Sequence, residues 1–152
     1  MKHGTFLVTH ADEESAVVQD VTDSQVHTLA DNPGLHEGEV LEATLEPEPP
    51  MEVAWQVTAL DEQRTIPVEH SQEPPTQQAR ELAADQQIGD LTTQDRAGEG
   101  ELHVLTVPPN QTADAAEEIV ADEETVARAA RLDVARVEVR AEDGVVSVRY
   151  LP

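Results

Sequence analysis

The sequence predicts an α+β protein, in which a small antiparallel β-barrel or meander of the SH3 or OB type precedes an α-β-α-β-β unit. Three observations favour this architecture. Short segments of strand-forming residues recur roughly every ten residues in the first half, as in small barrels. Helical periodicity begins only after the proline pair Pro74-Pro75. Two alternating segments around Glu142-Asp143-Gly144 then predict a hairpin.

The first half contains six segments that favour extended structure. Alternation is clearest after Gly38, where Leu41 and Leu45 share one face, and around Trp55. We expect Val53, Trp55 and Val57 to be buried with these leucines, and Glu42 and Glu52 to face water. A closed barrel would leave no exposed edge, whereas a meander would rest on the second half of the chain. The segments are residues 5–9, 15–21, 25–29, 40–46, 51–60 and, as an edge strand interrupted by Pro67, 64–69.

The second half alternates helical and extended patterns. Thr76 is placed as the N-cap of a helix over residues 77–89, and residues 92–95 fit the capping box of a further helical stretch. A strand over 102–107 precedes a long helical region, 112–132, which Asp122 interrupts. Strands at 136–140 and 145–151 complete a three-stranded antiparallel sheet with helices on one face. The predicted domains are therefore 1–70 and 76–152, joined by a linker at 71–75.

Charge is the most unusual property of the sequence. Asp and Glu number 32 against nine Lys and Arg, a formal net charge of −23, and Lys2 is the single lysine. The acids are spread along the chain among periodic apolar residues, which argues against a disordered acidic tail. In molar salt the Debye length falls to about 3 Å, so such a surface repels itself only at short range. The composition therefore predicts a halophilic protein.

Several function classes lack support in the sequence. There is no cysteine, and no apolar segment long enough for a signal peptide or a membrane span, so we expect a cytoplasmic protein. We find no nucleophile elbow and no Walker loop. The acid pairs are expected to be solvated, and no catalytic, cofactor or metal residue is predicted. Solvated or capping roles are expected for the six histidines, His3, His10, His27, His36, His70 and His103.

One segment departs from the acidic background. Residues 128–149 carry five arginines against four acids, and Arg136 and Arg140 share a strand face while Arg149 lies on the partner strand. Arg136, Arg140 and Arg149 could contact an anionic partner, or could pair with neighbouring carboxylates and hold the sheet together. A guanidinium suits both roles, so both hypotheses stay open.

Three stretches of the chain resemble an uncharacterised haloarchaeal family, a domain of unknown function restricted to extreme halophiles. They are residues 4–12 (GTFLVTHAD), residues 38–55 (GEVLEATLEPEPPMEVAW), and the closing stretch from Val137-Glu138-Val139-Arg140 through Tyr150-Leu151-Pro152. The resemblance implies a halophilic origin and two halves that belong together. It implies no activity and no site residues.

The favoured function is a non-enzymatic binding or adaptor module that contacts another macromolecule. A protein partner is one possibility. An RNA-binding accessory factor is an alternative, because small barrels often bind nucleic acid, although counterion release gains little in molar salt and aromatic residues are few. An enzyme of unrecognised type is the third hypothesis, and it would require a buried carboxylate or histidine pair in a pocket. The oligomeric state is not predicted.

The charge count generates a prediction about salt. The unfolded chain is more expanded than the folded one, so its carboxylates repel each other less, and diluting potassium chloride should lower the melting temperature. Mild acidification at low salt should partly restore it, because protonation removes the same repulsion. Circular dichroism melts from about 0.05 to about 2 M salt, which span Debye lengths from over 10 Å to under 3 Å, measure this. A flat melting temperature across that range would contradict it.

Overall fold

The chain forms two compact units. The computed structural model describes residues 1–96 and 100–152. The first unit comprises Met1–Ile66 together with Val126–Arg131, and the second comprises Pro67–Thr125 and Leu132–Pro152. The sequence-based boundaries 1–70, 71–75 and 76–152 remain a prediction about domains.

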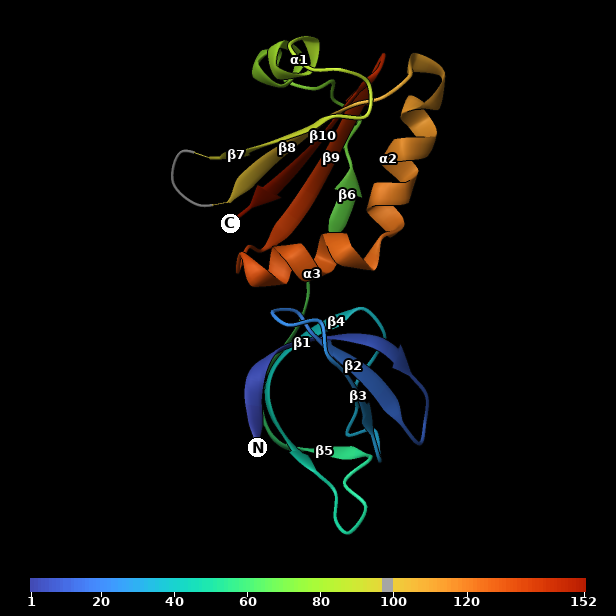
Figure 1. The fold of residues 1–152 in the computed structure, drawn as a ribbon, viewed down its shortest axis with the longest axis vertical. Helices are drawn as coiled ribbons and strands as arrows, with labels where there is room; N and C mark the ends of the chain where they lie inside the picture. Colours follow the sequence, from blue (N-terminus) through green and yellow to red (C-terminus); the bar gives the residue numbers. More distant parts are fainter. Residues whose placement is uncertain (97–99) are drawn as a thin grey trace. The chain divides into compact units, whose positions relative to one another are not determined.

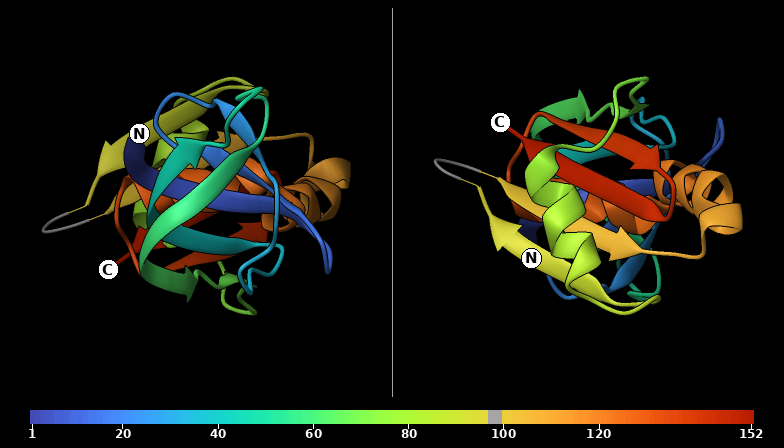
Figure 2. Two further views of the ribbon diagram at one scale, coloured as in Figure 1. Left: turned by 90° about the horizontal axis from the view of Figure 1, so that it is seen from below. Right: turned by 90° about the horizontal axis from the view of Figure 1, so that it is seen from above.

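The first unit contains a closed five-stranded barrel (Figure 1; Figure 2, left). Strand β1 pairs antiparallel with both β2 and β4, and β3 meets β5 in parallel where Leu29 lies opposite Trp55. The strand order β1-β2-β3-β5-β4 closes on itself and rules out the open meander. The strands are β1 (Lys2–Ala11), β2 (Ala16–Asp20), β3 (Val26–Leu29), β4 (Glu39–Pro47) and β5 (Trp55–Thr65).

Alternating apolar side chains fill the barrel, as the sequence pattern predicts. Leu41 and Leu45 are fully buried, and Trp55 and Val57 are half-buried against the same core. The expectation that Val53 is buried was wrong. Strand β5 starts only at Trp55, so Val53 lies in the preceding turn. The core consists of Phe6, Val8, Ala16, Val18, Leu29, Leu35, Leu41, Ala43 and Leu45.

The second unit is built on a five-stranded sheet in the order β6-β9-β10-β8-β7. The sheet was expected to have three strands. The two additional strands are the edges, β6 (Val68–His70), which pairs parallel with β9, and β7 (Leu91–Asp95), which pairs antiparallel with β8. The sequence pattern had assigned residues 64–69 to an edge strand of the first half. Residues 68–70 instead belong to the second sheet. The remaining strands are β8 (Glu101–Thr106), β9 (Arg136–Glu142) and β10 (Val145–Leu151).

The capping-box prediction at residues 92–95 was wrong, because this segment is strand β7. Two adjacent β-branched threonines, Thr92 and Thr93, favour extended backbone, and pairing with β8 supplies the backbone partners that a helix would have supplied. The spacing of threonine and acid alone could not separate the two possibilities. The predicted hairpin is confirmed, with Asp143 and Gly144 at φ 41° and 89° in the turn between β9 and β10.

The helix boundaries follow from side-chain caps. Thr76 Oγ1 accepts a hydrogen bond from Ala79 N at 3.2 Å and begins α1 (Gln77–Ala84). Asp122 adopts extended backbone and accepts from Glu124 N at 2.9 Å, which separates the predicted long helix into α2 (Thr112–Ala121) and α3 (Glu123–Arg131). A short 3-10 turn, η1 (Pro109–Gln111), precedes α2. No helix within the described ranges is both long and apolar enough to cross a membrane.

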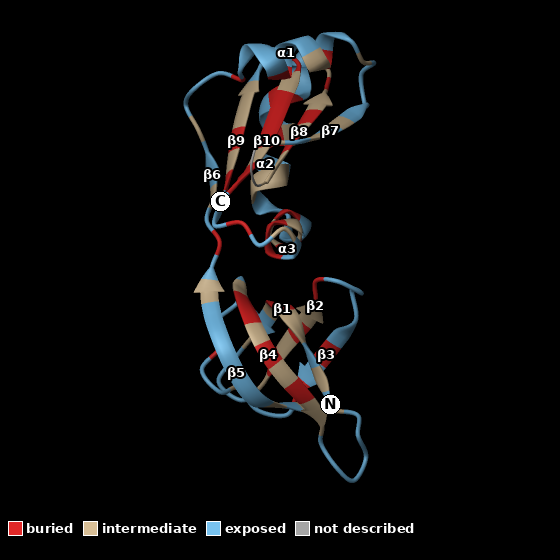
Figure 3. Ribbon diagram, turned by 90° about the vertical axis from the view of Figure 1, so that its left-hand side faces the viewer, coloured by how far each residue is buried: buried red, intermediate tan, exposed pale blue. Residues whose placement is uncertain are grey.

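Burial is not confined to one face of the second sheet, contrary to expectation. Ala79 and Ala83 of α1 pack against Leu102, Val104 and the half-buried Val145 on one face (Figure 2, right). The opposite face is buried as well, with Val137, Val139, Val148 and Tyr150. Figure 3 shows the consequence, since β10 is red over much of its length whereas β5 of the barrel is largely pale blue.

The closed barrel generates a prediction about stability. Leu41→Ala should lower the free energy of unfolding by about 2–5 kcal/mol, because it opens a cavity among packed side chains. Val26→Ala is the matched control, since Val26 is mostly exposed and its truncation should cost little. Urea unfolding in molar potassium chloride measures both variants without changing the ionic strength. Equal losses in the two variants would contradict the assignment of the core.

Candidate functional site

Three arginines of the C-terminal hairpin meet at one carboxylate, that of Glu138 on β9. Arg140 Nε and Arg149 Nη1 donate to Glu138 Oε1 at 2.6 and 2.7 Å. Arg136 Nη1 lies 3.9 Å from Glu138 Oε2. The structure thus brings together the three arginines that the sequence singles out. They share one sheet face, because Arg149 lies directly opposite Glu138 in the β9–β10 ladder.

Arg140 extends this cluster to the segment that precedes α1. Its Nη2 lies 2.9 Å from Glu73 Oε2, and its Nη1 donates to Pro74 O at 3.4 Å. Its side chain is 14% exposed. These contacts are the arrangement expected if the arginines hold the sheet together, and Arg140 in particular joins β9 to the chain between β6 and α1.

The electrostatics of Glu138 follow from its two closest arginines. Burial by itself would raise the pKa of the Glu138 carboxyl, but the hydrogen bonds and charges of Arg140 and Arg149 outweigh it and hold the pKa below its ordinary value. Glu138 is therefore a structural anion and is unsuited to act as a general acid near neutral pH.

Arg149 also lines a pocket of about 320 Å³ in the second unit. The other walls come from the first turn of α1, the end of β7 with the adjoining Arg96, and β8. Gln78 Nε2 donates to Gln94 Oε1 at 2.8 Å across this pocket. The lining residues are Thr76, Gln78, Gln94, Asp95, Arg96, Leu102 and Arg149.

The barrel presents a different kind of surface at the loop between β4 and β5. Met51 and Val53 are 75% and 76% exposed, although both are apolar. The loop is closed by two backbone hydrogen bonds, from Glu48 N to Ala54 O at 2.8 Å and from Glu52 N to Glu48 O at 3.0 Å. The exposed side chains therefore belong to a turn of defined shape.

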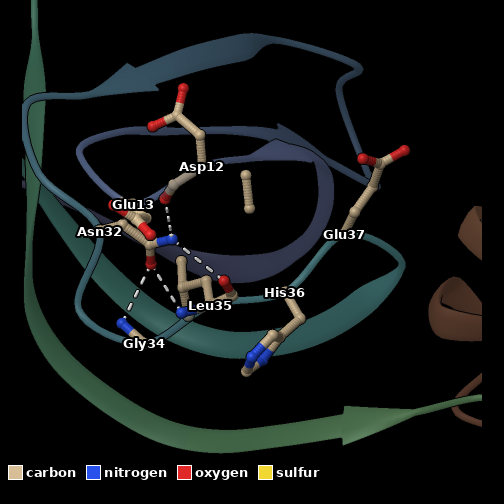
Figure 4. A pocket seen from close by; sticks show the side chains of 8 residues that line it. Asp12, Glu13, Asn32, Gly34, Leu35, His36 and Glu37 are labelled. Carbon is tan, nitrogen blue, oxygen red and sulfur yellow. Dashed lines mark hydrogen bonds between the residues drawn. The ribbon is translucent and has the colours of Figure 1, made fainter.

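The barrel also has a hollow of about 460 Å³, which lies between the β1–β2 loop and the segment that precedes β4 (Figure 4). Asn32 lines this hollow and holds the surrounding backbone by hydrogen bonds. Its Nδ2 donates to Asp12 O at 2.7 Å, and its Oδ1 accepts from Gly34 N and Leu35 N at 3.0 and 2.6 Å. The rim carries Asp12, Glu13 and Glu37, so its charge repels anions.

The sequence analysis missed a polar cluster around the single lysine. Lys2 Nζ lies 3.2 Å from Asp20 Oδ2, 2.9 Å from Asp23 Oδ2 and 3.2 Å from His27 Nε2. His27 is buried, contrary to the solvated role expected for it, and its ring lies 4.5 Å from that of Trp55. Burial first, and the Lys2 charge second, lower the pKa of His27. The uniqueness of Lys2 in the sequence was the one signal that could have pointed to this cluster.

Among residues 1–96 and 100–152, no group of three or more His, Asp or Glu side chains is arranged to hold a metal ion. Two histidines have a carboxylate close by. His103 has Glu101 as a neighbour at 2.9 Å, and His36 has Glu39 at 3.3 Å.

Comparison with known proteins identifies a family. Residues 2–141 match the sequence model of a family of unknown function, DUF5812, and the chain belongs to that family. No curated protein and no solved structure matches the chain significantly. The family agrees with the resemblance to an uncharacterised domain noted in the sequence, and it brings no activity.

The Glu138 cluster generates a prediction about pH. Glu138→Gln should lower the free energy of unfolding by about 2 kcal/mol at neutral pH, because it removes the ionised acceptor of two hydrogen bonds. Since the folded-state pKa is depressed, this contribution is present above the ordinary glutamate value of 4.5 and is lost as the pH falls through the folded-state pKa. The difference between wild type and variant should therefore shrink below pH 4.5.

Glu142→Gln is the control for this experiment. Glu142 pairs with Arg80 Nη2 at 2.8 Å, but both side chains are about half exposed, and such pairs contribute only about 0–1 kcal/mol. Urea unfolding at several pH values compares the two variants. A loss at Glu138 that is no larger than that at Glu142, or that does not change with pH, would show that the cluster is not a stabilising ion pair.

Proposed function

We propose that this member of the DUF5812 family is a non-enzymatic binding module of a halophilic cytoplasm, and that its barrel contacts a protein partner through the β4–β5 loop. The halophilic setting is supported by the ratio of 32 acids to nine bases. The binding role is supported chiefly by the exposure of Met51 and Val53 on one short loop. Contiguous exposed apolar surface rimmed by polar residues marks interaction sites more often than single exposed apolar residues do.

The position of this loop in the fold adds to the argument. In OB-type barrels the β4–β5 loop is one of the segments that contact oligonucleotides and oligosaccharides, so this place in a small barrel is accessible to a macromolecule. Here Pro49 and Pro50 precede Met51 and limit the backbone freedom of the loop. A loop that is already ordered loses less conformational entropy on binding than a flexible one.

The chemistry of the partner follows from the residues of the loop. Met51 and Val53 require an apolar depression, and methionine adapts to pockets of irregular shape. Glu48 precedes them, Glu52 lies between them, and both are exposed, so a rim of arginine or lysine around that depression would complement the loop. In molar salt the apolar contact supplies most of the affinity, because charge attraction is screened.

An RNA partner receives less support from the barrel. The β1–β2 loop, a second segment that contacts nucleic acid in OB-type barrels, carries the exposed acids Asp12, Glu13 and Glu14. Trp55, the largest aromatic side chain, is half-buried against the core and packs against His27. Phosphate repulsion and the loss of a stacking surface both weigh against RNA.

An enzyme also receives less support. Asp20 and His27 are both buried, and Lys2 contacts both. The ammonium group neutralises Asp20 and lies against His27 Nε2, which occupies the ring nitrogen that would accept a proton. Neither Asp20 nor His27 lines either of the two hollows described above.

The proposal predicts a site-specific cross-link. A photoreactive amino acid at position 51 or 53 of the full chain, expressed in a halophilic host, should cross-link one recurrent protein. The same group at Val26, which is also apolar and mostly exposed on the barrel, should not. The purified partner should bind the wild type in molar potassium chloride and lose about tenfold or more in affinity for the Met51→Asp, Val53→Asp double variant.

The outcomes separate the hypotheses. The double variant should keep its melting temperature, because both side chains are exposed. Cross-links from position 51 that are removed by nuclease would favour RNA instead. Equal cross-linking from positions 26 and 51, or unchanged affinity of the double variant, would refute the assignment of the loop.

A further inference from the structure

The pocket beside Arg149 differs in charge from the rest of the molecule. Two of the eight arginines, Arg96 and Arg149, line one concavity of about 320 Å³, and Asp95 is the one carboxylate among the described lining residues. These described residues carry a formal charge of +1, two arginines minus one aspartate, in a chain of net charge −23. In salt a pocket's own charges determine which ions it attracts, because more distant acids are screened.

Arg149 is held in place for binding by its partner Glu138. One of its Nη1 hydrogens is donated to Glu138 Oε1, and Nε and Nη2 make no hydrogen bond to any residue that the structure describes. Its side chain is 24% exposed and lines the pocket. A guanidinium fixed on one side and open on the other is a suitable donor for an oxyanion.

The glutamine pair supplies further donors. The hydrogen bond from Gln78 Nε2 to Gln94 Oε1 uses the carbonyl of Gln94 and one hydrogen of Gln78. It therefore fixes the orientation of Gln94, whose amide N–H groups have no other partner among the described residues. Thr76 Oγ1 accepts from Ala79 N, which leaves its hydroxyl hydrogen available.

The first turn of α1 forms the remaining wall. It contains no acidic residue, although Asp and Glu number 32 in the chain. The N-terminus of a helix carries a partial positive charge and attracts anions, and acidic side chains normally occupy this position. Here the turn and two arginines border the same pocket, while Leu102 contributes an apolar patch.

We propose that this pocket binds a small organic anion through a carboxylate or phosphate group. Arg149 and Arg96 contact the anionic oxygens, the amide of Gln94 donates a further hydrogen bond, and Leu102 contacts the carbon part of the ligand. The site lies in the second unit and is independent of the β4–β5 loop of the barrel, so either assignment can fail without the other.

Calorimetry and NMR titration of the full chain test the site. The probes are succinate for a carboxylate and inorganic phosphate for a phosphate, each added as the potassium salt at constant molar potassium chloride. Saturable binding of one probe, with shifts confined to the pocket residues, is expected and identifies the anion class. Absence of saturable binding of both probes, or equal shifts across the surface, would overturn the proposal.

The decisive variant is Gln78→Glu. It places a carboxylate in the pocket and should weaken binding by about tenfold or more. The variant loses the hydrogen bond from Gln78 to Gln94, but the new charge at the helix N-terminus favours folding and offsets that loss, so the melting temperature should change little. Loss of binding therefore could not be attributed to unfolding.

Gln77→Glu is the matched control. It adds the same charge to the same helical turn, but Gln77 does not line the pocket. The Gln77 side chain donates to Glu81 Oε1 at 3.1 Å, so the loss of this hydrogen bond should lower the stability of the control slightly. Its affinity for the anion should stay within about twofold of wild type. Equal affinity losses in both variants would indicate general charge repulsion and overturn the assignment of the pocket.

Discussion

The scarcity of positive charge is the constraint on which much of this structure depends. With nine basic side chains against 32 acids, several of the few ammonium and guanidinium groups connect elements that lie apart in the sequence. Lys2 connects the start of β1 to the turn after β2, Arg140 connects β9 to the segment before α1, and Arg80 connects α1 to the end of β9. Acids left over from these contacts face solvent, where ions screen them.

Much of the fold could be predicted because local signals agree with tertiary packing. The alternation around Leu41 and Leu45 marks the barrel core, Thr76 begins a helix, and Asp122 divides one. The failures occur where two structures share a pattern. Val53 alternates in step with Trp55, but the strand begins at Trp55. Residues 92–95 match a capping box and a strand equally well, and only the position of β8 decides between them.

The candidate sites were less accessible to sequence reasoning. The period of a strand was enough to place three arginines, Arg136, Arg140 and Arg149, on one sheet face. That they meet at Glu138 depends on the register of β9 against β10, which the sequence does not reveal. The pocket beside Arg149 draws on four separate elements, so no short motif encodes it. Val53 was expected to be buried because an exposed apolar residue cannot be told from a core residue in the sequence pattern alone.

The order of the strands in the second sheet has a consequence for synthesis on the ribosome. All five strands of the barrel lie within the first 65 residues, so their pairing can be completed early. In the second sheet, β10 lies at the centre and is the last strand in the sequence, while β6 must wait for β9. The nascent chain therefore carries β6, β7 and β8 with incomplete pairing until Leu151 has emerged, and the acids that surround them keep these unpaired strands apart during that interval.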